Sequence, residues 1–308
     1  MSTENNTQKQ DTRADQEDLQ RYIDSSRLSV RFSRFMRQLF RNRGAIFGLI
    51  VVAIVVACAV FSPLLAPYPP NEIDSINMLL PPSTEHLMGT DDIGRDILSR
   101  IIFGARISTI VGIVSIGIAM LLGIPLGVIS GFYGGTADSI IMRIMDVLLS
   151  FPALVLALFI MAVLGPSAIN AMIAIGVVYT PNFARLARAN VLSIREMTFV
   201  EAARSIGFSQ WHIMFREILP NSIAPLIVQA SLGVAYAILM EAALGFLGLG
   251  VQPPTPSWGS MLSEGRVLLK LAPWYSTFPG LAIFFTVLAL NLFGDGLREA
   301  LDPRLKQA

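Results

Sequence analysis

Long apolar segments, separated by shorter polar ones, make up most of the chain. A helix needs about 20 predominantly apolar residues to cross the ~30 Å hydrocarbon core of a bilayer. Segments of this kind are predicted at residues 44–61, 107–130, 140–164, 168–184, 222–243 and 278–294. The pattern therefore predicts an all-α membrane protein with six transmembrane helices, in a membrane domain that runs from residue 44 to residue 308.

The region before the first apolar segment is polar and basic. Residues 1–26 carry few aromatic side chains and many charges, which predicts a disordered tail. In residues 27–43 apolar side chains repeat at helical spacing while arginines share another face, which predicts a basic amphipathic helix along the inner membrane surface. A nucleic-acid site is the weaker interpretation, because this basic run adjoins a membrane span. No cleavable signal peptide is predicted, since the first apolar run starts too late.

The composition agrees with a membrane protein and argues against several kinds of chemistry. Of the 308 residues, 53% are hydrophobic and 15% are charged. Cys58 is the only cysteine, so a disulfide framework is excluded. His86 and His212, the only histidines, are predicted on opposite sides of the membrane, where they cannot share a metal ion. We therefore predict no metal site and no cofactor bound by this chain.

The distribution of basic residues predicts the orientation. With both termini in the cytoplasm, 18 of the 23 Lys and Arg residues lie on the inner side of the six predicted spans. Cytoplasmic segments carry an excess of Lys and Arg in membrane proteins. The N- and C-termini are therefore predicted to be cytoplasmic.

The polar segment between the fourth and fifth spans, residues 185–221, has the pattern of two short helices. Thr198 and Glu201 have the spacing of a capping box, which predicts a helix start. Gly207 is predicted to end this helix in the left-handed region, and Ser209 to cap a second helix. Pro220 is predicted to end the second helix.

Apolar side chains in this segment follow helical spacing on both predicted helices. They are Phe199, Ala203 and Ile206 on the first, and Trp211, Met214, Phe215 and Ile218 on the second. Exposing all of them to water is unfavourable, so they require a covering surface. That surface is either another protein or the membrane and the chain's own helix ends, and the pattern alone leaves both open.

The same segment resembles the EAA signature of the permease subunits of bacterial ABC importers. The matching residues are Glu201-Ala202-Ala203, then Gly207, then Ile218-Leu219-Pro220, which are contiguous here with one residue fewer than in the family pattern. In that family the loop forms coupling helices that sit in a groove of the ATPase subunit. The resemblance implies that ATPase coupling is carried by Glu201, Ala202, Ala203, Arg204, Ser205, Gly207, Phe208, Leu219 and Pro220.

Three further stretches resemble the C-type permease of dipeptide, oligopeptide and nickel importers. They are GTDDIGRDILSRIIFGARIS (89–108), FLGLGVQPPTPSWGSML (246–262) and NLFGDGLREALDPRLK (291–306), and Gly245 stands where the family has serine. The resemblance implies a bacterial inner-membrane subunit that forms half of a pore with a related second permease. It also implies ATP-binding subunits that carry ATP and Mg²⁺, and an extracytoplasmic substrate-binding protein.

Other mechanisms of transport or catalysis lack their motifs. No lysine follows a glycine, so a P-loop is absent and any ATP must be hydrolysed by another chain. A self-contained secondary transporter is an alternative, but we find no internal repeat. An intramembrane hydrolase is a further alternative, but no G-x-S-x-G sequence occurs.

A few residues within the predicted spans are candidates for a pore or gate. Pro125 is predicted to kink the second span beside a ridge of small side chains that favours close helix packing: Ser115, Ala119, Gly123, Gly127 and Gly131. Intramembrane acids are functional candidates. Asp146 is predicted to pair with Arg143 one turn earlier, and Glu241 to lie at the outer end of the fifth span, within reach of water.

The segment between the fifth and sixth spans, residues 250–276, is predicted to be external. It is rich in proline and carries Trp258, Trp274 and Tyr275. Aromatic side chains near a membrane surface are typically interface anchors. The resemblance implies that external loops face the binding protein.

Overall fold

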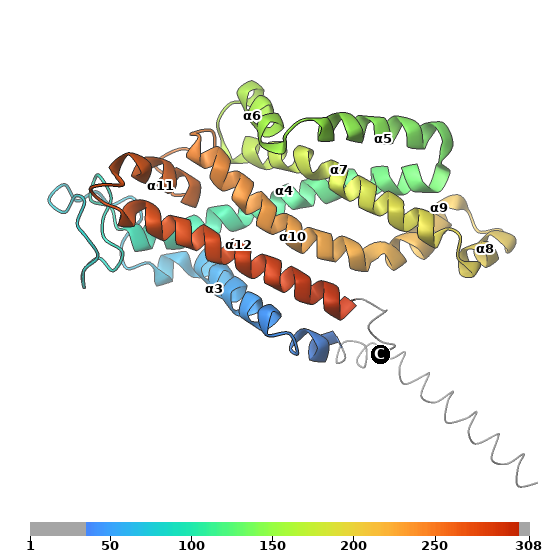
Figure 1. Cartoon of the computed structure of the whole chain (residues 1–308), viewed down its shortest axis with the longest axis horizontal. Coiled ribbons are helices and arrows are strands. Elements are labelled where there is room, and N and C mark those ends of the chain that lie inside the picture. The colour runs from blue at the N-terminus through green and yellow to red at the C-terminus, as the bar shows by residue number, and fades with distance from the viewer. Residues whose placement is uncertain (1–34, 302–308) are drawn as a thin grey trace, which may run out of the picture.

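A computed structural model describes residues 35–301 of the chain, and its regular structure over this range is helical. The long helices lie side by side and run along the longest axis of the molecule (Figure 1). Helix α11 and the loop before α4 lie at one end of this bundle, and helices α8 and α9 lie at the other (Figure 1). The predicted tail at 1–26 lies outside the described residues.

The helices follow one another with short connections, except for the long loop between α3 and α4. Their bounds are α3 Arg43–Leu65, α4 Ile97–Tyr133, α5 Gly135–Ser150, α6 Ala153–Leu164, α7 Ala168–Ile194, α8 Thr198–Ser205, α9 Gln210–His212, η1 Ile213–Ile218, α10 Leu219–Phe246, α11 Trp258–Gly265, η2 Arg266–Leu268 and α12 Trp274–Leu301. Of the predicted amphipathic helix at 27–43, only the part from residue 35 is described, and residues 35–39 are helical.

Four helical stretches are long and apolar enough to cross a membrane: α3, α4, the continuous stretch from α9 to α10, and α12. The bent pair of α5 and α6 brings the number to five if it forms one span. Helix α7 is not among them, although it is 27 residues long. Because α7 packs inside the bundle, it tolerates more polar residues than a helix in lipid. The all-α membrane fold is confirmed, while the number of six spans stays a prediction.

The predicted third span, 140–164, is wrong as a single helix. Helix α5 ends at Ser150, helix α6 begins at Ala153, and the two are bent by 93°. Phe151 has extended backbone angles, as expected for a residue that precedes a proline. Pro152 then occupies the cap position before α6, where its missing N–H removes no helical hydrogen bond. The break is therefore encoded by the Phe151-Pro152 pair.

The centre of the bundle is the contact between α4 and α7. Along α4 the ridge of small residues is buried, and a Cβ added at Gly127 would lie 2.2 Å from the carbonyl oxygen of Ala184. Gly123 and Gly131 meet α7 in the same way, at the carbonyl oxygens of Thr180 and Arg188. Close helix packing along the ridge is confirmed. The backbone of α4 stays helical through Pro125, which is exposed, so no helix break supports the predicted kink.

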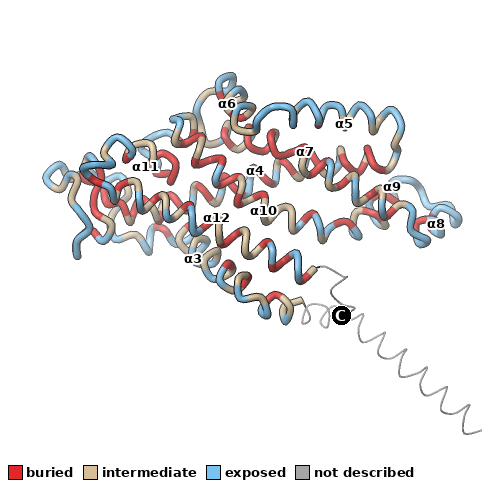
Figure 2. The backbone as a smooth tube through the Cα atoms, viewed as in Figure 1, coloured by how far each residue is buried: buried red, intermediate tan, exposed pale blue. Residues whose placement is uncertain are grey.

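The helices that pack around α4 and α7 differ in how far they are exposed. Figure 2 shows buried residues concentrated along α4, α7 and α10, whereas α5 and much of α3 are exposed. Helix α3 is apolar on all sides and little buried, which is typical of a helix that faces lipid. At the start of the described chain, Leu39 is buried against α3 and α12, in contact with Ala45, Leu297 and Ala300.

A substitution at Gly127 tests the central contact. We expect Gly127→Val to destabilise the protein by about 3 kcal/mol or more, because the new side chain must push the backbones of α4 and α7 apart. Gly117 in the same helix is exposed and has no atom within 4 Å of an added Cβ, so Gly117→Val is the matched control. Thermal unfolding in detergent measures both. Equal unfolding midpoints for the two variants would contradict the contact.

Candidate functional site

The predicted two-helix loop is present at one end of the bundle. Helix α8 spans Thr198–Ser205, a turn follows, and the second helix starts at Gln210 (Figure 1). Gly207 has φ of +82°, so the predicted left-handed residue is confirmed. The N–H of Gly207 donates to the carbonyl of Arg204, and the N–H of Phe208 donates to that of Ala203. These two bonds form a Schellman motif, which ends α8.

The sequence predicts the start of the second short helix correctly, but not that of the first. The predicted capping box is wrong, because Thr198 is the first residue of α8 and Met197 occupies the cap position without a side-chain hydrogen bond. Ser209 does cap the second helix, and its hydroxyl accepts a hydrogen bond from the N–H of His212. The turn between the helices is therefore held by Gly207 and Ser209.

Pro220 does not end the second helix, contrary to the prediction. Residues 210–246 form one continuous helical stretch, in which residues Ile213–Ile218 adopt a π-helix. Pro220 is the second residue of α10 and directly follows the π-helix, whose changed hydrogen-bond pattern accommodates a residue without an N–H. The π-turn precedes the proline, and single π-turns of this kind are often found at functional sites. The two-helix loop, residues 198–218, which we call the coupling loop after its predicted role, thus continues directly into a membrane-length helix.

The apolar side chains of the loop divide into a buried and an exposed set. Val200, Ala203, Met214 and Ile218 are buried in the same core that includes α4 and α7. The exposed set comprises Ile206 at 71%, Trp211 at 61%, Phe215 at 47%, Phe208 at 43% and Phe199 at 37%. Trp211 and Phe215 stack with ring centroids 5.5 Å apart. The chain's own helices therefore cover one set, and the other set stays exposed.

The other residues of the EAA stretch lie on the outside of the loop. Glu201, Ala202, Arg204, Ser205 and Gly207 are exposed, and Pro220 is exposed where α10 begins. Leu219 is half-buried. The structure thus brings the predicted coupling residues together at one end of the molecule.

The predicted ion pair of Asp146 with Arg143 is wrong, because Asp146 pairs with Arg185 instead. The carboxylate of Asp146 lies 2.7 Å from the guanidinium of Arg185, and both side chains are half-exposed. Helix α5 runs beside α7, so the arginine comes from a neighbouring helix rather than from the preceding turn. A second ion pair, Asp138 with Arg188, joins the same two helices. These pairs hold α5 on α7, and nothing among the described residues marks Asp146 as a gate.

Glu241 is fully buried, which contradicts the prediction that water reaches it. The hydroxyl of Ser108 in α4 donates to its carboxyl group at 3.1 Å. The start of α11 packs over this part of α10, and a Cβ at Gly259 would lie 2.6 Å from the carbonyl oxygen of Ala242. The folding of the segment after α10 thus excludes water from Glu241.

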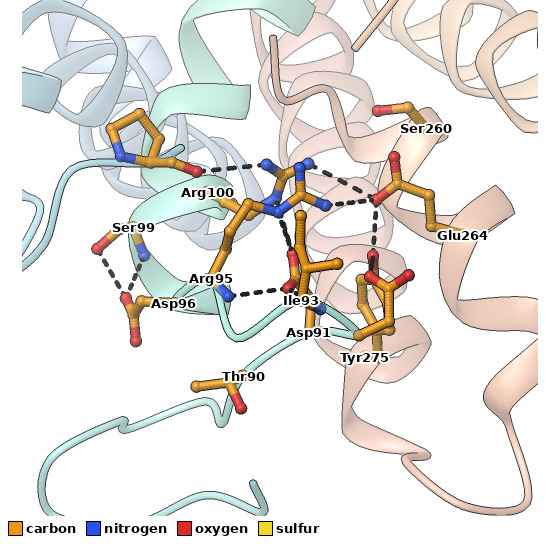
Figure 3. A network of polar contacts seen from close by, with 12 residues as sticks. Thr90, Asp91, Ile93, Arg95, Asp96, Ser99, Arg100, Ser260, Glu264 and Tyr275 are labelled. Atoms are coloured by element: carbon orange, nitrogen blue, oxygen red, sulfur yellow. Dashed lines mark hydrogen bonds and ion pairs between the residues drawn. The ribbon is translucent and has the colours of Figure 1, made fainter. Parts of the chain in front are cut away.

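A network of largely buried ion pairs lies at the opposite end of the bundle (Figure 3). Asp91 accepts hydrogen bonds from the backbone N–H groups of Ile93 and Arg95 and from the Arg95 side chain. Glu264 of α11 lies 3.3 Å from Arg95 and 3.6 Å from Arg100, and accepts a hydrogen bond from the Tyr275 hydroxyl. The network therefore ties the loop before α4 to α4, α11 and α12.

This network changes two expectations. Trp258 and Tyr275 are buried, so they are packing residues rather than membrane-interface anchors; the indole N–H of Trp258 donates to the carbonyl of Ile101. Burial opposes the charge of Arg95, yet Asp91, Glu264 and Tyr275 together outweigh it and raise the pKa of the guanidinium above its usual value. Two of the five arginines and lysines predicted outside are thus neutralised by acids, Arg95 and Arg100.

The bundle, the membrane-length helices and the exposed two-helix loop define a membrane transport permease. The chain belongs to the family of binding-protein-dependent transport system inner membrane components, whose model matches residues 123–307. The model for the N-terminal transmembrane domain of oligopeptide transport permease C matches residues 31–82. The chain is accordingly a permease subunit of an ABC importer and not an enzyme, because ATP is hydrolysed by partner ATPases.

Similar proteins include several peptide permeases. The dipeptide transport system permease protein DppC of Alkalihalophilus pseudofirmus is 50% identical over 88% of this chain and 89% of its own length. The di/tripeptide permease DppC of Pseudomonas aeruginosa is 48% identical over 89% of this chain and 92% of its own. The glutathione permease GsiD of Pectobacterium atrosepticum is 45% identical over 88% of this chain and 91% of its own.

Solved structures support the fold. A chain of the MetNI methionine ABC transporter, in an inward-facing conformation, matches with a TM-score of 0.56 at 18% identity. The match covers 66% of this chain and 96% of the other. At this identity the likeness concerns the fold alone.

Among residues 35–301, no group of three or more His, Cys, Asp or Glu side chains is placed to hold a metal ion.

A substitution at Arg100 tests the buried network. Arg100 is only 1% exposed, and replacing it by methionine leaves buried acids partly uncompensated. We expect Arg100→Met to lower the unfolding midpoint by roughly 5–10 °C in detergent. Arg106 in the same helix is exposed, so Arg106→Met should leave the midpoint unchanged. A midpoint for Arg100→Met that equals the control would show that the network contributes nothing to stability.

Proposed function

We propose that this permease imports small peptides or peptide-like solutes. The names of its relatives support this cargo, since they include dipeptide, di/tripeptide and glutathione permeases. The pore is completed by a second, related permease subunit. An extracytoplasmic binding protein delivers the solute to the end of the bundle that carries α11, and separate ATPase subunits bind at the opposite end.

The exposed apolar set of the coupling loop is the observation that carries the ATPase contact. Ile206, Phe208, Trp211 and Phe215 lie at one end of the molecule, and no other described part of the chain covers them. A groove on an ATPase subunit, which carries ATP and Mg²⁺, supplies the covering surface. Glu201 and Arg204, exposed beside this set, give the contact its charge complementarity.

Force enters the membrane domain through the buried set of the same loop. Val200 and Ala203 of α8, and Met214 and Ile218 of the second helix, pack into the core around α4 and α7. Binding of ATP by the ATPases favours one pore state by the difference in its affinity for the two loop positions. Because packed cores change between discrete arrangements, a small loop movement is transmitted along α10.

The inner membrane is the proposed location, with both termini on the cytoplasmic side. The predicted excess of basic residues on that side supports this orientation. Reporter fusions at Ile206 and Ala308 should indicate the cytoplasm, whereas fusions at Asn71 and Ser260 should indicate the outside. An external reporter signal at Ile206 would exclude ATPase binding at this loop.

A pair of substitutions at Gly207 tests the coupling loop. No atom lies within 4 Å of an added Cβ, so only the backbone conformation opposes a side chain there. Valine in the left-handed region costs more than the ~1 kcal/mol of an ordinary residue, whereas asparagine tolerates it. We expect Gly207→Val to insert and pair with its partner permease but to lose uptake, and Gly207→Asn to keep it. Co-purification of the ATPases and solute uptake are the measurements. Wild-type uptake by Gly207→Val would contradict the mechanical role of the loop.

A further inference from the structure

A hollow opens between α7, α10 and α12 in the half of the bundle nearest the coupling loop. Its volume is about 560 Å³, within the range of ~300–1,000 Å³ typical of small-ligand pockets. It extends along α10 from Asn221 to Leu232, which corresponds to roughly 16 Å of helix rise. A short peptide in extended form rises ~3.3–3.6 Å per residue, so two or three residues fit within this length.

The lining of the hollow combines groups that bind the charged and polar parts of a peptide. Arg298, exposed on α12, is a bidentate donor for a carboxylate. Asn221 donates its amide N–H to the carbonyl of Glu217, and Gln229 donates to the hydroxyl of Tyr179. The amide oxygen of each side chain is left to accept from an ammonium group or a peptide N–H.

Apolar side chains fill the space between these polar groups. Leu186 of α7 and Val228 and Leu232 of α10 contribute to the lining. A mostly apolar wall with a few convergent polar groups is the usual construction of a small-molecule site. Hydrocarbon tails of lipid would satisfy the apolar residues but would offer no donor to the amide oxygens of Asn221 and Gln229, which is costly in a membrane.

We propose that this hollow is a solute-contact site on the inner half of the translocation pathway, and that it binds the carboxylate end of a small peptide. The assignment rests on the proposed import of peptides. Arg298 binds the carboxylate, and the amide oxygens of Asn221 and Gln229 accept from the peptide N–H groups or the ammonium group. Leu186, Val228 and Leu232 contact the peptide's side chains.

The site is joined directly to the coupling loop. Asn221 follows Pro220, the last residue of the EAA stretch. Its amide N–H donates to the carbonyl of Glu217, which lies within the π-helix. Movement of the loop therefore changes the position of Asn221 relative to Arg298 on α12. This gives the ATPase a physical route to alter affinity for the solute.

Photo-labelling of the assembled importer, with its second permease, ATPases and binding protein in proteoliposomes, tests the assignment. The probe is a dipeptide whose second residue carries a benzophenone side chain and a free carboxylate. We expect label on residues 186 and 221–232, and we expect excess dialanine to compete while its C-terminal amide does not. Loss of the charge-assisted contact in Arg298→Gln should reduce this label about tenfold. Arg106→Gln, which removes an exposed arginine near the start of α4 and outside the lining of the hollow, is the control and should label like the wild type.

The other outcomes separate this assignment from the proposed cargo. Uptake of the probe without label at these residues, or equal label in Arg298→Gln, would overturn the site but leave peptide import standing. Label from a photoreactive phosphatidylglycerol that dialanine cannot displace would identify a lipid site instead. Absence of peptide uptake by the wild-type importer would overturn both. Arg298 is exposed, and an unchanged unfolding midpoint for Arg298→Gln excludes misfolding as the cause of lost label.

Discussion

The close contact between α4 and α7 is the constraint on which the rest of the structure depends. Glycines on α4 meet the backbone of α7 directly, so the two helices share an interface that leaves no space for a side chain. In lipid, where the hydrophobic effect does not drive helices together, such packing is a main source of association. Enclosing α7 in this way also allows it to carry polar residues. The coupling loop follows α7, and its buried set packs into the same core. The loop is therefore anchored in the core of the bundle by its buried set, while its other apolar side chains stay exposed.

The two ends of the bundle are built from different interactions. Ion pairs among Asp91, Arg95, Arg100 and Glu264 join the loop before α4 to α4 and α11, and the Tyr275 hydrogen bond adds α12, whereas the other end offers an exposed apolar loop. Breaking a buried ion pair is costly, so the first end is held as a unit. An exposed apolar surface is suited to binding, so the second end is the one we propose for the contact with another protein. The chain thus combines one end held by ion pairs with an opposite end whose exposed apolar loop is, in the proposed function, the ATPase contact.

Local features of the fold follow from the sequence, while contacts between distant residues do not. The apolar segments predict α3, α10 and α12 closely, and the glycine signal places the left-handed turn at Gly207. The Phe151-Pro152 break could have been predicted as well, since a proline disfavours helix at the preceding residue. The pairing of Asp146 with Arg185 and the burial of Glu241 depend on which helices pack together, and sequence spacing carries no such information. The continuation of the helix through Pro220 depends on the π-turn before it, which the apolar pattern did not indicate.

Hydrogen exchange of the paired permeases, with and without their ATPases, tests most directly whether the coupling loop is where the ATPase binds. Exchange reports local opening, which a bound partner suppresses. We predict slower exchange at residues 198–218 when the ATPases are present, together with unchanged exchange at residues 250–276 at the opposite end. Unchanged exchange at 198–218 in a complex that retains the ATPases would contradict the account.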